Sequence, residues 1–150
     1  MPAEGIFLRS GPGLTVLKQS AYDSESVLQT ALADHPEVLA GPTTTGEDEA
    51  WLLLIRREMG VPSAENGAGT FSLDHLFIDG DGVPVLVEVK RSSDTRIRRE
   101  VVGQMLDYAA NAVKYWPVAS LQDSLEKRAE AEGKSVDELL EQLRPGLDPV

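Results

Sequence analysis

The chain has 150 residues, of which 41% are hydrophobic and 26% are charged. That balance is typical of a globular domain rather than a disordered chain, and the length is sufficient for one hydrophobic core. The absence of cysteine excludes disulfides, thiolate catalysis and cysteine-ligated zinc. The apolar runs are far shorter than the ~20 residues that cross a bilayer, and the N-terminus lacks a secretory signal pattern. We therefore expect a cytoplasmic protein with no membrane partner.

The net charge of −11 argues against a protein that coats nucleic acid through excess Lys and Arg. Positive charge is nevertheless uneven along the chain. Residues 126–141 are largely acidic, whereas a short earlier segment is rich in cations: Lys90, Arg91, Arg96, Arg98 and Arg99. Two interpretations stay open, because these cations could form a local basic rim on an acidic body or could solvate the start of a helix.

The first elements expected along the chain are a hairpin and a helix. Two apolar runs within residues 6–17 are separated by a Gly-Pro-Gly turn, which predicts an edge hairpin. Apolar residues then recur with a helical period, with Asp23 or Ser24 as the cap and Pro36 near the end. This prediction puts Glu25 in the first turn of the helix.

Three strands are expected next. The apolar run Trp51–Ile55 is typical of a short buried strand, which Gly60-Val61-Pro62 would close. Phe71–Asp79 and Val83–Lys90 predict two further strands joined by Gly80-Asp81-Gly82, whose glycines can supply the positive φ of a three-residue hairpin loop. Apolar residues on both faces of the last strand indicate that it is buried.

Helices are expected in the remainder of the chain. A long helix should run from about Thr95 to Tyr115, followed by one over Leu121–Glu132 and another begun by a capping box at Ser135 and Glu138. The long helix has one apolar stripe, formed by Ile97, Val101, Val102, Met105, Leu106, Ala109 and Val113. The predicted fold is an α/β domain with a central mixed β-sheet flanked by helices.

The expected organisation is a single domain with a short tail. Residues 1–116 would form its core and residues 117–144 a helical extension of the same domain. Pro and Gly in residues 145–150 suggest a linker to a missing C-terminal region, so the chain could be a fragment of a longer protein.

The hairpin around Asp81 carries the charged residues of greatest interest. Pairing outward from Asp81 sets Asp74 opposite Glu88, and the period of two along a strand puts Lys90 on the same face as Glu88. Directly opposed residues have Cβ atoms about 5 Å apart, so the two carboxylates would crowd together, which is destabilising without a compensating cation. Mg²⁺ or Mn²⁺ suits one or two carboxylates together with water and phosphate oxygens. The alternative is that these three residues are surface neighbours at a strand edge.

Such a grouping has a use in phosphodiester hydrolysis. A bound metal ion polarises the phosphate and lowers the pKa of a water molecule, while Lys90 could orient that water or help to deprotonate it. Asp74, followed after thirteen residues by Glu88-Val89-Lys90, resembles the D…ExK signature of the PD-(D/E)XK nuclease superfamily, which has the restriction-endonuclease-like fold. Gln104 and Tyr108 resemble the QxxxY motif of its RecB-type modules.

The resemblance covers about residues 22–116 and implies a set of roles. Asp74 and Glu88 would bind the metal with the Val89 carbonyl, and Lys90 would be the catalytic lysine. Glu25 would reach the metal through water, and Gln104 and Tyr108 would help hold the substrate or the lysine. Leu73 stands where the signature has proline, a frequent variation.

Simpler interpretations stay open for the supporting residues. Glu25 could be an acid favoured by the helix macrodipole, and Gln104 and Tyr108 could border the apolar stripe. Arg96 and Arg99 could contact phosphates, or could be solvating charges. His75 is expected to be a packing histidine on the opposite strand face, and His35 a surface residue at a helix end.

Two functions of different classes are therefore in view. The first is a magnesium- or manganese-dependent nuclease, with DNA favoured over RNA as the partner and a homodimer possible. The second is a non-catalytic module that keeps the fold and binds nucleic acid or a protein. The resemblance favours the first, and the net charge favours the second.

Overall fold

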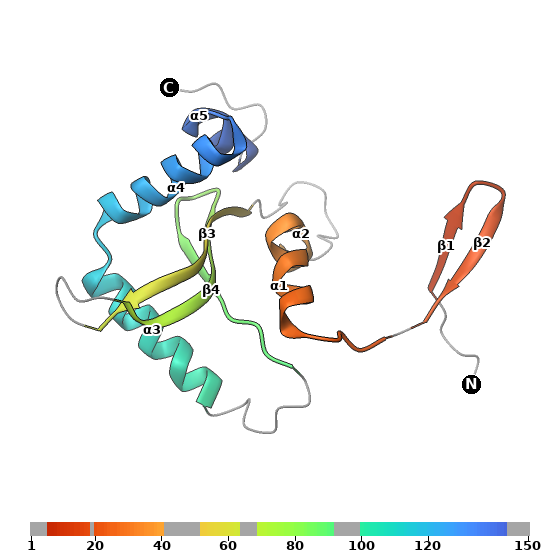
Figure 1. The fold of residues 1–150 in the computed structure, drawn as a ribbon, viewed down its shortest axis with the longest axis horizontal. Helices are drawn as coiled ribbons and strands as arrows, with labels where there is room; N and C mark the ends of the chain where they lie inside the picture. Colours follow the sequence, from red (N-terminus) through yellow and green to blue (C-terminus); the bar gives the residue numbers. More distant parts are fainter. Residues whose placement is uncertain (1–5, 19, 41–51, 64–68, 92–99, 144–150) are drawn as a thin grey trace.

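The computed structural model describes residues 6–18, 20–40, 52–63, 69–91 and 100–143 (Figure 1). Its strands and helices, in chain order, are β1 Ile6–Ser10, β2 Gly13–Leu17, α1 Glu25–Asp34, α2 Glu37–Ala40, β3 Leu52–Pro62, β4 Gly69–Asp79, β5 Pro84–Val87, α3 Val102–Tyr115, α4 Val118–Glu132, α5 Val136–Leu140 and the 3-10 turn Glu141–Leu143. The predicted α/β class is confirmed.

The central sheet has the strand order β3-β4-β5, and its pairings are antiparallel throughout the described residues. The mixed sheet that we expected is therefore not present in this part of the chain. Parallel neighbours need a crossover of a dozen or more residues, whereas β4 and β5 are joined by a tight turn, and only residues 63–68 separate β3 from β4. Short connections of this kind produce an antiparallel meander.

Strand β3 is much longer than the buried strand predicted at Trp51–Ile55. It continues through Gly60-Val61-Pro62, the segment that was expected to close it. The prediction was too short because residues 56–58 are charged and exposed, although Met59 and Val61 beyond them are buried again. Charged residues suit a sheet edge, which is where β3 lies.

The β4–β5 hairpin has the register that pairing outward from Asp81 predicts. The amide of Asp79 donates to the carbonyl of Val83 at 3.0 Å, and Asp79 Oδ1 accepts from the amides of Asp81 and Val83 at 2.9 and 2.8 Å. Of the two loop glycines only Gly82 has a positive φ, at 80°. The side chain of Asp79 thus fixes the loop together with Gly82.

Helix α1 begins directly after Ser24, so Glu25 lies in its first turn as predicted. The helix ends at Asp34, and α2 follows beyond His35 and Pro36, so the predicted helix is divided in two. Proline disfavours a helical conformation for the residue before it, which explains the break.

Helix α3 buries a different face from the predicted stripe. Val102, Leu106 and Val113 are 58%, 67% and 91% exposed, whereas Tyr108 and Ala112 are buried. The Tyr108 ring lies 5.7 Å from the ring of Phe71 on β4. Ile97 lies outside the described residues. Of the predicted stripe, Met105 does pack against the core, but the buried face is rotated toward Tyr108 and Ala112 and includes Gln104, which bonds to Glu88.

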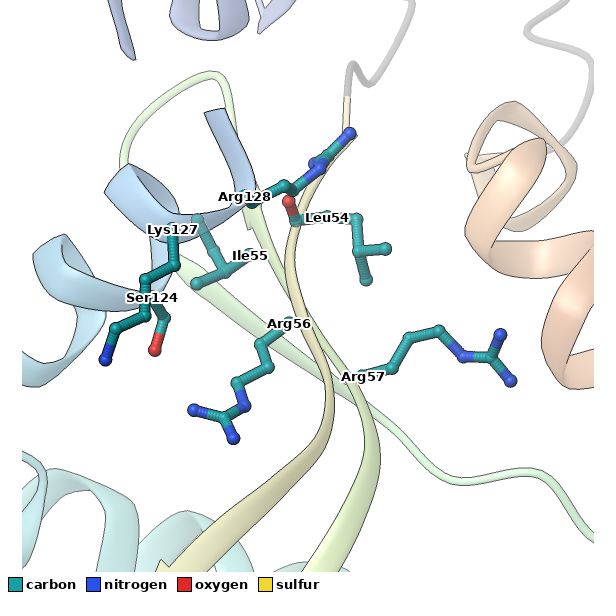
Figure 2. A pocket seen from close by; sticks show the side chains of 7 residues that line it. All are labelled: Leu54, Ile55, Arg56, Arg57, Ser124, Lys127 and Arg128. Carbon is teal, nitrogen blue, oxygen red and sulfur yellow. The ribbon is translucent and has the colours of Figure 1, made fainter. Parts of the chain in front are cut away.

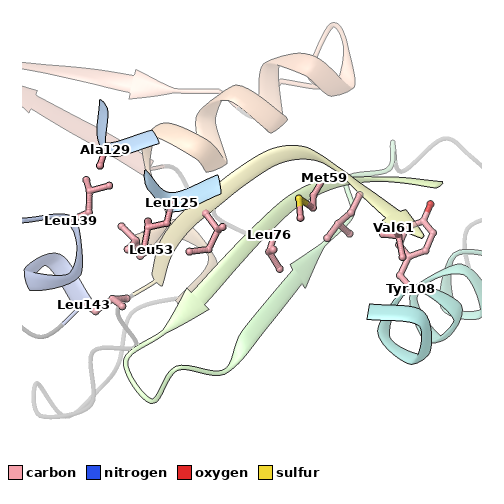
Figure 3. Packing of buried hydrophobic residues seen from close by; sticks show 11 residues of the cluster. Leu53, Met59, Val61, Leu76, Tyr108, Leu125, Ala129, Leu139 and Leu143 are labelled. Carbon is pink, nitrogen blue, oxygen red and sulfur yellow. The ribbon is translucent and has the colours of Figure 1, made fainter. Parts of the chain in front are cut away.

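The C-terminal helices cover the outer edge of β3 and complete the core (Figure 3). The Trp116 indole donates to the Gly60 carbonyl at 2.9 Å, and the Arg128 guanidinium donates to the Leu54 carbonyl. Both bonds satisfy backbone groups that an edge strand leaves free. Apolar side chains of these helices join the buried cluster: Leu125, Ala129, Leu139 and Leu143.

Two local predictions are confirmed at the ends of the chain. Ser135 Oγ accepts from the Glu138 amide at 3.1 Å, and the Glu138 carboxylate accepts from the Ser135 amide at 2.6 Å, which is the predicted capping box. The hairpin β1–β2 also forms, standing apart from the sheet in Figure 1 with its apolar side chains exposed. Within the described ranges, no helix is long and apolar enough to cross a membrane.

Candidate metal and phosphate site

The site lies where β5 ends beside β4. The ladder pairs Ile78 with Pro84 and continues in register to His75 and Val87. One step further, the same register sets Asp74 opposite Glu88. Strand β5 stops at Val87 and not at the predicted Lys90, because Asp74 Oδ2 then accepts the Val89 amide at 2.7 Å. A side-chain bond thus takes over from the backbone ladder and fixes the position of Glu88-Val89-Lys90.

Glu88 is a buried carboxylate with two unequal oxygens. Its side chain is 4% exposed, and Oε1 accepts from Lys90 Nζ at 2.6 Å and from Gln104 Nε2 at 3.3 Å. Its Oε2 is buried and has no hydrogen-bond partner among the described residues. A buried carboxylate oxygen without a partner costs about 1–3 kcal/mol or more, so Oε2 is a position where a cation would be stabilising.

Lys90 is surrounded by negative charge. Its bond to Glu88 raises the pKa of the Lys90 ammonium above its usual value, and the charges of Asp74 and Glu25 raise it further. Partial burial acts in the opposite direction without cancelling these effects. Lys90 is therefore a cation at neutral pH, held within reach of three carboxylates.

Gln104 and Tyr108 support Glu88 from the direction of α3. The amide Nε2 of Gln104 donates to Glu88 Oε1 and also to the Tyr108 hydroxyl. Tyr108 itself is only 3% exposed and packs in the core. The two residues predicted from the QxxxY spacing thus come together with the acids, and in the described contacts they position Glu88.

Glu25, in the first turn of α1, contacts the backbone next to the site; the expected contact was with a metal ion through water. Its Oε1 accepts the Arg91 amide at 2.9 Å, and the Arg91 guanidinium donates to the carbonyls of Tyr22 and Asp23 at 3.2 Å each. Glu25 therefore ties the start of α1 to the segment after Lys90. The sequence prediction treated Arg91 only as one of a run of cations, and nothing in its spacing indicated this anchoring role.

His75 has the structural role that was predicted for it. It is fully buried, its Nε2 donates to the Gln29 carbonyl at 2.7 Å, and its ring stacks on that of Phe77 at 5.7 Å. This bond fastens α1 to β4. Two further predicted residues, Arg96 and Arg99, lie outside the described residues.

The residues present fit a cation held by two carboxylates. The opposed acids Asp74 and Glu88 and the unpartnered Glu88 Oε2 supply hard oxygen donors, the type that Mg²⁺ prefers. In the described part of the chain, no group of three or more His, Asp or Glu side chains is placed to hold a metal ion. Mg²⁺ usually takes one or two protein carboxylates and completes its shell with water and phosphate, so a third is not required.

A cavity of about 540 Å³ opens beside the supporting pair on α3. Gln104 and Tyr108 line it together with Phe71, Glu100 and Asp107. The two carboxylates make this wall negative. It is a poor place for a phosphate, in contrast to the substrate contact that the QxxxY resemblance implied for Gln104 and Tyr108.

Comparisons with known proteins leave the site to be judged on its own geometry. No protein-family model matches the chain, and neither a curated protein nor a solved structure shows a significant similarity to it.

Proposed function

We propose that the chain is a metal-dependent nuclease that hydrolyses phosphodiester bonds, with DNA as the favoured substrate. One observation carries this proposal above the others. A buried carboxylate, Glu88, is held at one oxygen by Lys90 and Gln104 while its other oxygen has no partner in the described residues. Such an arrangement is costly for stability alone, since a buried carboxylate oxygen without a hydrogen-bond partner loses its hydration even when the other oxygen is ion-paired.

Each residue of the site has a distinct part in this reaction. Asp74 and Glu88 would hold the metal, with the Val89 carbonyl as a further ligand, while Asp74 also fixes the Val89 amide. Bound there, Mg²⁺ or Mn²⁺ would polarise the phosphate and supply a water of lowered pKa. Lys90, a cation whose side chain is 27% exposed, would orient the attacking water and offset charge on the phosphate.

The supporting residues would act through Glu88 and Lys90. Gln104 keeps Glu88 Oε1 engaged, which would leave Oε2 available to hold the metal. Glu25 holds the backbone that follows Lys90 and adds to the negative charge around its ammonium. Both are therefore positioning residues in this proposal, and a water-mediated contact from Glu25 to the metal would be an additional role.

A second function is favoured by one property of the chain. The net charge of −11 suits a non-catalytic module that uses the same fold to bind a partner, because phosphate is repelled by an acidic body. Such a module has no need for a carboxylate pair beside a lysine, and a site without a catalytic use need not bind metal.

The test is metal-dependent cleavage. Wild-type protein and Lys90→Ala are incubated with single- and double-stranded DNA and with RNA, in Mn²⁺ or in EDTA, and the products are resolved by gel. We expect wild-type cleavage in Mn²⁺ alone and a loss of about 10²-fold or more in Lys90→Ala. The absence of metal-dependent cleavage on every substrate, or a mutant as active as the parent, would overturn the proposal.

A further inference from the structure

A second cavity, bordered by cations, lies between β3 and α4 (Figure 2). It measures about 310 Å³ and is lined mainly by cationic and polar side chains: Arg56, Arg57, Ser124, Lys127 and Arg128. Arg57 borders the cavity, but its guanidinium points away from Ser124 and Lys127 (Figure 2), so the cations that can face a ligand there are Arg56, Lys127 and Arg128. The sequence did not reveal this grouping, because residues 56–57 and 127–128 are far apart along the chain.

The cations differ in how far they are already engaged. Lys127 pairs with Asp123 at 2.6 Å, and Arg128 pairs with Glu132 at 2.7 Å while also donating to the Leu54 carbonyl. Arg56 is exposed, and no carboxylate of the described residues lies within ion-pair distance of it. Arg57 is likewise exposed with no ion pair among the described residues, so these two arginines are the lining cations most able to take a new anionic ligand, and the direction of each side chain decides between them.

The side chains of Arg56 and its neighbour point in opposite directions. Figure 2 shows Arg56 on the same side of β3 as Ser124 and Lys127, whereas the guanidinium of Arg57 points away from them. The β-bulge between Leu54 and Arg56 breaks the regular register just before this point. Bulges of this kind re-aim a side chain at the rim of a sheet.

The register relates this cavity to the proposed catalytic site. Arg56 pairs with Leu76, which pairs with Leu86, so these three form one row across the sheet. Asp74 and Glu88 lie two residues along β4 and β5, on the same face by strand alternation. Strand spacing therefore puts the Cα atoms of Arg56 and Asp74 about 8 Å apart. Since phosphates of a stacked strand advance about 3.4 Å each, the two positions are a few nucleotides apart.

We propose that this cavity, through Arg56 and Lys127, holds a backbone phosphate of a nucleic-acid strand whose scissile phosphate lies at Glu88 and Lys90. This inference rests on the proposed function and specifies how an acidic protein retains its substrate. A guanidinium and an ammonium match phosphate oxygens, and such contacts set the position of a strand without reading its bases. The cavity beside Gln104, with its two carboxylates, would repel the same group.

The test compares Arg56→Ala with Arg57→Ala, an adjacent change of equal charge whose side chain points the other way. Binding of a fluorescein-labelled single-stranded DNA is followed by anisotropy in Mn²⁺, across a salt titration, with Lys90→Ala present in every protein, the reference included, to prevent cleavage. We expect Arg56→Ala to weaken binding by about three- to tenfold and to lower the slope of log K against log salt by about 0.7, the loss of one phosphate contact. Arg57→Ala should stay within about twofold of the reference, and Arg56→Lys should recover most of the loss.

Three outcomes would overturn the inference. The two alanine variants could bind equally, which would reduce the effect to general charge. Arg56→Ala could bind like the reference. Polyglutamate could compete as well as DNA at equal charge and lose affinity equally in Arg56→Ala, which would indicate a site for acidic proteins.

A steady-state assay in Mn²⁺ separates this inference from the proposed function. If wild type cleaves DNA, Arg56→Ala should raise KM with kcat nearly unchanged, because a contact remote from the reacting atoms is made equally before and during the reaction. If wild type binds DNA through Arg56 but cleaves nothing, the nuclease proposal fails while the phosphate site stands.

Discussion

Glu88→Gln is the most informative single change, because it keeps the shape of the side chain and removes its charge. Opposed strand positions put the Cβ atoms of Asp74 and Glu88 about 5 Å apart, and two like charges separated by a similar distance would repel by about 3 kcal/mol at an effective dielectric constant near 20. The substitution relieves this repulsion from Asp74 but also removes the 2.6 Å ion pair with Lys90. Since the two effects oppose each other, we expect the free energy of unfolding without metal to change by about 1 kcal/mol or less.

A bound metal ion should stabilise wild type more than Glu88→Gln. A ligand at one hundred times its Kd stabilises the folded state by about 2.7 kcal/mol, which corresponds to about 5 to 10 °C in Tm for a chain of this size. We expect Mn²⁺ to raise the Tm of wild type by that amount and that of Glu88→Gln by much less, in parallel melts with and without EDTA. Glu126→Gln, on the exposed face of α4, is the matched control and should respond like wild type. Equal shifts in all three proteins, or none in wild type, would refute the assignment of Glu88 as a ligand.

Three further changes test the structure around the site. Gln104→Leu removes the donor that holds Glu88 Oε1 and should lower kcat about 10- to 100-fold with little change in Tm. Its control is Gln122→Leu, at an exposed position on α4. Equal activities of the two variants would contradict the positioning role of Gln104. Ser135→Ala breaks the capping box and should cost about 1 kcal/mol in a urea melt, so an unchanged midpoint would argue against the cap. The pKa of Glu132 is lowered from 4.5, first by Lys134 and then by Arg128, so its stabilising effect is present above pH 4.5 and is lost as the pH falls through the lowered pKa. Glu132→Gln should therefore reduce stability at neutral pH by at most about 1 kcal/mol and have no effect in acid, and a pH-independent loss would exclude this ion pair as the cause.

The parts of the fold that sequence reasoning predicted well are those set by local chemistry. The turn around Asp81 could be located because glycine and aspartate favour it and strands alternate on either side. From that turn alone the register followed, and with it the opposition of Asp74 and Glu88. The capping box at Ser135 was equally local. Each of these features depends on residues within a few positions of one another.

The parts that were missed depend on packing between distant segments. The length of β3 was hidden because its charged middle, residues 56–58, lies at a sheet edge where helices α3 and α4 provide the missing contacts. The buried face of α3 was mispredicted because a polar residue, Gln104, faces inward to Glu88, while Leu106 and Val113 stay exposed. Hydrophobic periodicity assumes that polar residues face water, and a buried polar site violates that assumption.

The positions of the charges explain how a protein with a net negative charge could bind the proposed substrate. Around Lys90 stand three carboxylates, those of Asp74, Glu88 and Glu25, so the site without metal is negative and would repel phosphate. In the proposed function, a divalent cation would reverse that balance at the reacting position, and Arg56 would supply a cationic contact a few nucleotides away. The net charge of −11 therefore argues only against a protein that coats nucleic acid through its overall charge. It leaves room for a site whose affinity depends on one metal ion and a few placed cations, because fields near a cleft are set by the nearest charges.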